Sequence, residues 1–118
     1  MKRKSTNPHV LNLIKSLYAK STDSTNSLWK DLAKRLESPR RNWAEINLTR
    51  LNRITQKGDT IVVPGKVLGM GELDHDLTIY AFSGSENVQN KVKSAGGSFG
   101  TINDLIEKGK VTGVKIIK

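Results

Sequence analysis

The sequence predicts a small α/β protein in which a basic helical N-terminal section precedes a layer of strands and helices. Its 118 residues suffice for one domain with a modest hydrophobic core. Apolar residues recur at helical spacing up to Lys57, whereas β-branched runs typical of strands begin after Gly58. We therefore expect residues 1–118 to form a single domain, with a basic helical section over 1–57 and an α/β section over 58–118.

The first section is expected to contain three helices. They span Pro8 to about Lys20, about Ser27 to Glu37, and Asn47 to about Lys57. Asn7 is a suitable N-cap ahead of Pro8, Pro39 disfavours helix before it, and Gly58 is a typical helix stop. The polar stretch 21–26 between the first two helices is expected to be a loop.

The second section is expected to alternate strands with helices. The predicted strands are 60–63, 66–68, 77–82, 98–100 and 114–117, and the predicted helices are 85–95 and 101–109. Pro64 and Gly65 fit the central positions of a type II turn, which would place Lys66 at the tip of that turn. Gly69 to Gly71 reads as a flexible connection.

Composition excludes several classes of site and protein. The chain has no cysteine, which excludes disulfide frameworks, cysteine-based zinc sites and cysteine nucleophiles. No apolar run approaches the ~20 residues that span a bilayer, and the basic start leads into no apolar signal region. We expect a cytoplasmic protein that is not exported and has no membrane partner.

The positive charge is concentrated in one half of the chain. The formal net charge is +9, with 20 Lys and Arg against 11 Asp and Glu. Residues 1–57 hold 13 of the basic groups and four of the acids, so they alone net +9, while residues 58–118 hold seven of each. This asymmetry predicts a surface that binds a polyanion such as nucleic acid. A solvated basic face without a specific partner, and a helix on a membrane surface, are the competing interpretations.

The strongest local signal runs from Pro39 to Trp43 and continues along the third predicted helix. Arginine forks bind phosphate oxygens and also stack on bases. Arg50, Arg53 and Lys57 would lie within roughly 60° of one another on that helix, away from its apolar arc. Trp43 leaves two interpretations open, stacking on an unpaired base or burial in the core, and the second is favoured because aromatic residues are few.

The only concentrated titratable set is Asp74, His75 and Asp76. It raises the possibility of an acid–base or metal site, so a small enzyme is one rival hypothesis. Adjacent residues of an extended segment point to opposite faces, and the only other histidine is His9. Hydrogen bonding within a loop is therefore the preferred role for Asp74 and His75, and no cofactor or metal is predicted.

Several runs of the sequence resemble a known protein family. They are Thr6-Asn7-Pro8, Pro39-Arg40-Arg41, Glu45-Ile46-Asn47-Leu48, Gly58-Asp59-Thr60, Val63-Pro64-Gly65-Lys66-Val67-Leu68-Gly69, Gly71-Glu72-Leu73-Asp74-His75 and Gly113-Val114-Lys115-Ile116-Ile117-Lys118. In this order they resemble the eighteen-e family of archaeal and eukaryotic large-subunit ribosomal proteins, which is related to the bacterial fifteen-type protein. The resemblance implies an irregular stack of strand-strand-helix units and a structural protein without catalytic activity. It also implies large-subunit ribosomal RNA and neighbouring large-subunit proteins as partners, with no small-molecule substrate.

The charge pattern and the resemblance together predict the contact residues. The expected phosphate contacts are Lys2, Arg3, Lys4, Lys34, Arg35, Arg40, Arg41, Arg50, Arg53, Lys57 and Lys66. Asn42 or Trp43 is the expected base contact. A free-standing RNA-binding regulator with the same basic face is the alternative function.

Overall fold

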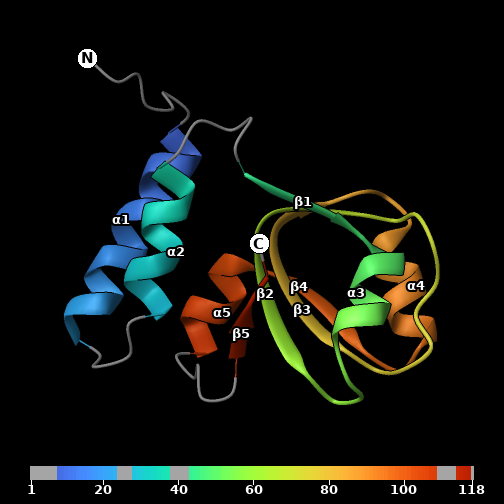
Figure 1. Ribbon diagram of the computed structural model, residues 1–118. Helices are drawn as coiled ribbons and strands as arrows, with labels where there is room; N and C mark the ends of the chain where they lie inside the picture. The colour runs from blue at the N-terminus through green and yellow to red at the C-terminus, as the bar shows by residue number, and fades with distance from the viewer. Residues whose placement is uncertain (1–7, 24–27, 38–42, 109–113, 118) are drawn as a thin grey trace.

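In the computed structural model a parallel β-sheet lies between two layers of helices (Figure 1). The structure describes residues 8–23, 28–37, 43–108 and 114–117. The helices are α1 (Pro8–Asp23), α2 (Leu28–Glu37), α3 (Leu48–Ile54), α4 (Val88–Ser94) and α5 (Ile102–Lys108). The strands are β1 (Ala44–Asn47), β2 (Thr60–Leu68), β3 (Thr78–Gly84), β4 (Ser98–Thr101) and β5 (Val114–Ile116). The predicted α/β class is confirmed.

The strand order is β1-β2-β3-β4, and every pairing is parallel. β5 also pairs with β2, at residues 60–62, whereas β1 pairs with residues 65–68. β1 and β5 therefore share the edge of β2 that faces away from β3. Parallel neighbours need crossover connections, and α3, α4 and α5 each lie between two strands of the sheet in the chain.

Alternation along the central strands separates two hydrophobic clusters. Val62 and Tyr80 belong to the first cluster, together with side chains of α1, α2 and α5. Ile61, Val63 and Ile79 belong to the second, together with side chains of α3 and α4. Because successive side chains of a strand point to opposite faces, α1, α2 and α5 cover one face of the sheet and α3 and α4 the other.

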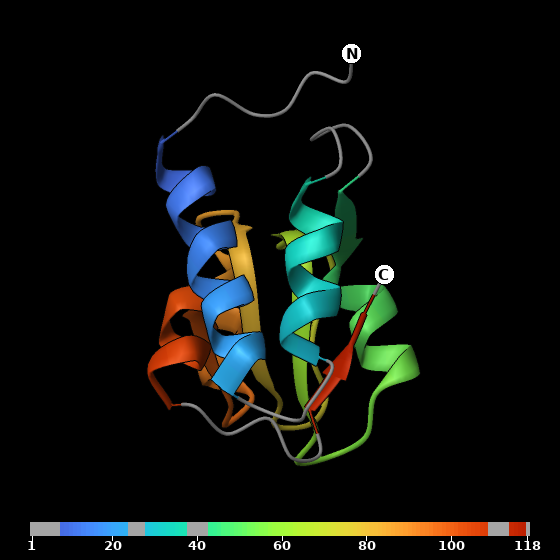
Figure 2. The same ribbon diagram turned by 90° about the vertical axis from the view of Figure 1, so that its left-hand side faces the viewer.

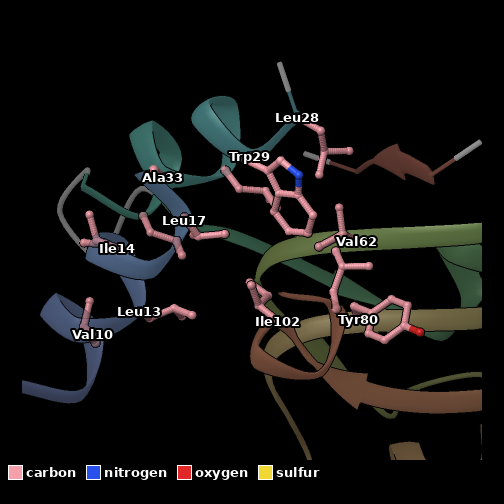
Figure 3. Close-up of a cluster of buried hydrophobic side chains, with 13 residues drawn as sticks. Val10, Leu13, Ile14, Leu17, Leu28, Trp29, Ala33, Val62, Tyr80 and Ile102 are labelled. Atoms are coloured by element: carbon pink, nitrogen blue, oxygen red, sulfur yellow. The ribbon is translucent and has the colours of Figure 1, made fainter. Parts of the chain in front are cut away.

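The first cluster joins the two N-terminal helices to the sheet (Figure 3). Trp29 of α2 is fully buried there, near Val62 of β2. α1 and α2 are joined further by the Tyr18 hydroxyl, which donates to Glu37 Oε1 over 2.8 Å. This hydrogen bond is the main reason that the pKa of Tyr18 is raised above 10.0. The basic helices are therefore packed on the sheet (Figure 2).

Two predicted helix ends are wrong. α1 continues to Asp23, because the hydroxyls of Ser21 and Thr22 donate to the Tyr18 carbonyl and are satisfied within the helix. α3 ends at Ile54 rather than near Lys57. At Thr55 the backbone becomes extended, with φ −117° and ψ 167°, and the Thr55 hydroxyl donates to the Leu51 carbonyl over 2.6 Å.

The predicted turn at Pro64-Gly65 is also wrong, because β2 is one strand of nine residues. Val63 pairs with Ala81 and Lys66 with Ser83, so Pro64 and Gly65 occupy a β-bulge. A bulge tolerates proline in a central strand, since the missing N–H falls where the ladder is interrupted. β1 was not predicted as a strand, since four residues are too few for a periodic signal.

The remaining predicted elements are confirmed near their expected positions. They are α2, β3, α4, β4, α5 and β5. The start of α5 has the expected cap, with Asp104 N–H donating to Thr101 Oγ1 and Thr101 N–H to Asp104 Oδ2. Within the described residues, no helix has the length and apolar character to cross a membrane.

Candidate nucleic-acid interface

The predicted contact residues are distributed over several elements. Lys2, Arg3, Lys4, Arg40, Arg41 and Asn42 lie outside the described residues. Lys34 and Arg35 lie on α2, Arg50 and Arg53 on α3, and Lys66 on β2. Because α2 and α3 pack on opposite faces of the sheet, the basic section that is continuous in sequence is divided between two layers (Figure 1).

On α2, Lys34 and Arg35 differ in their availability. Lys34 is exposed. Arg35 Nε lies 3.3 Å from Asp31 Oδ1, one helical turn earlier, as an ion pair whose geometry is not that of a hydrogen bond. Part of the charge of Arg35 is therefore compensated within the helix, while that of Lys34 is presented to solvent.

The α3 cations are presented from a helix fixed at its start. Asn47 caps α3, because its side-chain oxygen accepts the Arg50 N–H over 2.9 Å. Leu48 and Leu51 are fully buried, which turns the opposite side outward. Arg50 and Arg53 are exposed, about 60° apart around the axis, and within the described residues neither forms an ion pair.

The loop that carries the Asp-His-Asp set holds α3 in place. Asn52 Nδ2 donates to Asp74 Oδ2 over 3.1 Å, and Asp74 N–H donates to Asn52 Oδ1 over 2.8 Å. His75 Nε2 lies 2.9 Å from Thr55 Oγ1. Since that hydroxyl donates its proton to Leu51, His75 Nε2 must be the donor in this contact. Asp74 and His75 therefore have the loop hydrogen-bonding role preferred from the sequence.

The described residues form no metal site at this loop. Among them, no group of three or more His, Asp and Glu side chains is placed to hold a metal ion. The carboxylate and imidazole groups of Asp74 and His75 are turned toward α3. The geometry gives the small-enzyme hypothesis no support.

Lys57 and Lys66 are both exposed but do not lie where the sequence placed them. Lys57 follows the end of α3, so it does not share the helical face of Arg50 and Arg53. Lys66 lies within β2 rather than at a turn tip, and its strand neighbour on β1 is the exposed Glu45.

Trp43 is half-buried and packs against the first cluster. Its ring meets that of Phe82 edge to face, with centroids 4.8 Å apart and an interplanar angle of 70°. This geometry is a favourable aromatic contact and agrees with the core interpretation.

Sequence reasoning did not identify Met70, which is 68% exposed beside α3. Its carbonyl accepts the Thr49 N–H over 3.2 Å. The segment Gly69 to Gly71, expected to be flexible, is held by Lys91, whose Nζ donates to both glycine carbonyls over 2.8 Å. No local sequence signal could have found this, because Lys91 is 20 or more residues away.

Comparison with known proteins gives one consistent family. Residues 24–100 match the family described as ribosomal proteins 50S-L15 and 50S-L18e together with their 60S counterpart. The chain is 45% identical over 114 residues to the large ribosomal subunit protein eL18 of Methanoregula boonei, covering 96% of this chain and 94% of that protein. Its identity to the eL18 protein of Methanothermobacter thermautotrophicus is 40% over the same length, with the same coverage. At this identity and coverage, the chain belongs to the eL18 family of large ribosomal subunit proteins.

Proposed function

We propose that this protein is a structural constituent of the large ribosomal subunit that binds large-subunit ribosomal RNA. Its place is then in the cytoplasm, in the ribosome, beside other large-subunit proteins, and its role is not catalytic. The family relationship supports the ribosomal role. The charge distribution supports RNA as the partner, because the excess of +9 is confined to residues 1–57.

The mechanism is charge neutralisation. Lysine and arginine side chains displace counterions condensed on the phosphates, so that RNA segments pack closely around the protein. The side chains that fill this role are Lys2, Arg3, Lys4, Lys34, Arg35, Arg40, Arg41, Arg50, Arg53, Lys57 and Lys66. Asn42 or Trp43 contacts a base, with Trp43 doing so by any ring surface that Phe82 leaves open.

The observation that carries the proposal is the arrangement of Arg50 and Arg53. Both are exposed without an ion pair in the described part of the chain, on a helix tied down by Asn52 and Thr55. A fixed helix loses little conformational freedom when its arginines bind, so the binding free energy is not spent on ordering the backbone. Two cations at fixed spacing suit consecutive phosphates.

Because α2 and α3 lie on opposite faces of the sheet, the protein can contact RNA from two sides. This arrangement favours a protein inserted between RNA segments over one that binds a single short ligand. It therefore favours the ribosomal role over that of a free-standing regulator.

The test is sedimentation of native cell extract through sucrose gradients at low salt and at about 1 M salt. We expect near-stoichiometric migration with the large subunit at low salt. Retention at high salt would add that the protein is enclosed by RNA folds. A protein that stays at the top of the gradient even at low salt would overturn the ribosomal role and make the regulator the leading function.

A further inference from the structure

The outer edge of β4 carries an unused pair of backbone hydrogen-bonding groups. β4 pairs only with β3 among the described strands. Ser98 N–H donates to the Leu77 carbonyl over 3.1 Å, so the polar backbone groups of Ser98 point toward β3. In a parallel ladder these directions alternate, which turns the N–H and C=O of Phe99 away from β3 and those of Gly100 toward it.

The same alternation explains the neighbouring contact at Thr101. Its N–H points outward and is taken by Asp104 Oδ2 over 2.9 Å, as part of the α5 cap. Phe99 is the strand residue whose outward groups no described residue is seen to bind. Its side chain packs against the second cluster, which fixes the backbone at the edge.

A hollow of about 420 Å³ lies beside this edge, lined by residues of β3, β4 and α5. We call it the β4 groove. Lys108 Nζ lies 5.8 Å above the centroid of the Tyr80 ring and covers part of it. The Asp104 and Glu107 carboxylates also line the groove, and both residues are exposed.

The charge of the groove is opposite to that of the chain. Two carboxylates and one ammonium group line it, whereas the chain nets +9. RNA phosphates are disfavoured beside Asp104 and Glu107, and a cationic segment is favoured. An open strand edge with a groove beside it is the geometry of strand addition, in which main-chain hydrogen bonds bind an extended peptide.

We propose that the β4 edge binds an extended, lysine- or arginine-bearing segment of another protein by adding it as a strand next to Phe99. The main-chain groups of Phe99 supply the hydrogen bonds, and Asp104 and Glu107 attract the cationic side chains. This surface is separate from the cations of α2 and α3 and does not depend on RNA binding.

Amide hydrogen exchange of the free full-length protein, followed by NMR, tests the proposal. The probe is a short peptide in which lysine alternates with threonine, and the control is its glutamate counterpart. In the absence of peptide we expect fast exchange at the Phe99 amide and slow exchange at the Gly100 amide. The lysine peptide is expected to slow exchange at Phe99 by at least about tenfold and leave Gly100 unchanged.

Two charge reversals separate the groove from general electrostatics. Glu107→Lys is expected to weaken the lysine peptide by roughly fivefold. Glu86→Lys changes the net charge equally at an exposed position that does not line the groove, and it should leave the affinity nearly unchanged.

Three results would overturn the proposal. They are protection of the Phe99 amide before peptide is added, equal protection by the glutamate peptide, and an equal loss of affinity in both charge reversals. Concentration-dependent protection without peptide would instead indicate pairing between β4 edges of two copies. Because no RNA is present, none of these results bears on the ribosomal role.

Discussion

Asn52 and Asp74 exchange two hydrogen bonds across 22 residues of sequence, from Asn52 Nδ2 to Asp74 Oδ2 and from Asp74 N–H to Asn52 Oδ1. This pair fixes α3 to the loop that follows β2, and α3 carries Arg50 and Arg53. An acidic residue that resembled part of an active site in the sequence therefore orients two proposed RNA contacts.

Removing the pair should weaken RNA binding without unfolding the protein. Asn52→Ala loses both hydrogen bonds at a partly exposed site, so we expect a loss of about 1 kcal/mol in the free energy of unfolding. Asp74→Asn keeps the backbone donor and a side-chain acceptor and serves as the matched control. Urea unfolding and filter binding to large-subunit RNA check both, and equal affinity of Asn52→Ala and wild type would refute the positioning role.

The α3 arginines should contribute to the salt dependence of RNA binding. Replacing Arg50 and Arg53 by Ala should make the slope of log K against log salt shallower by about 1.4 for single-stranded RNA and about 1.8 for duplex. Lys93→Ala, an exposed position on α4, is the control and should change the slope little. An unchanged slope in the double variant would mean that these arginines do not contact phosphate.

Lys91 should stabilise the Gly69–Gly71 segment. Its ammonium group donates to the Gly69 and Gly71 carbonyls and lies 3.4 Å from Glu72 Oε2. Lys91→Met leaves both carbonyls without this donor, and we expect a loss of about 2 kcal/mol. Lys93→Met, two positions later and exposed, should cost less than about 0.5 kcal/mol. Thermal unfolding compares them, and similar melting temperatures would contradict the assignment.

Two glycines should respond differently to alanine. At Gly97 a Cβ would overlap the Leu77 carbonyl oxygen and approach its nitrogen to 2.7 Å, so neighbouring strand backbone must move. At Gly58, with φ +83°, there is open space and only the backbone conformation resists. We expect Gly97→Ala to cost about 3 kcal/mol or more and Gly58→Ala about 1 kcal/mol in urea unfolding. The reverse order would show that the strand backbone yields easily.

Asp59 should make folding sensitive to acid. Its carboxylate accepts the Gln56 N–H over 2.9 Å, and this hydrogen bond, aided by Lys115, holds the pKa of Asp59 below its ordinary 3.8. A lowered folded-state pKa gives stability that is present above 3.8 and is lost as pH falls through the folded value. Wild type should therefore exceed Asp59→Asn in melting temperature near neutrality, and the difference should shrink below about pH 4. A difference that stays constant down to about pH 2 would contradict this.

Sequence patterns predicted most elements because their signals are local. Pro8 begins α1 as expected, and Thr101 caps α5. Val88 and Val92 are buried on α4 as their spacing indicated. The Pro64-Gly65 turn was wrong because the same dipeptide fits a turn and a bulge, and only the paired strands β1 and β3 decide between them.

By itself the sequence determined the α/β class, the confinement of the net charge to residues 1–57 and the family resemblance, because these depend on composition, periodicity and runs of adjacent residues. Only the tertiary structure decided that Lys34 and Arg50 lie on opposite faces of the sheet. It also decided that Asp74 and His75 support α3 and that Lys91 fixes Gly69 and Gly71. These contacts join residues 20 or more positions apart, and the folding of strands and helices around a common core brings them together.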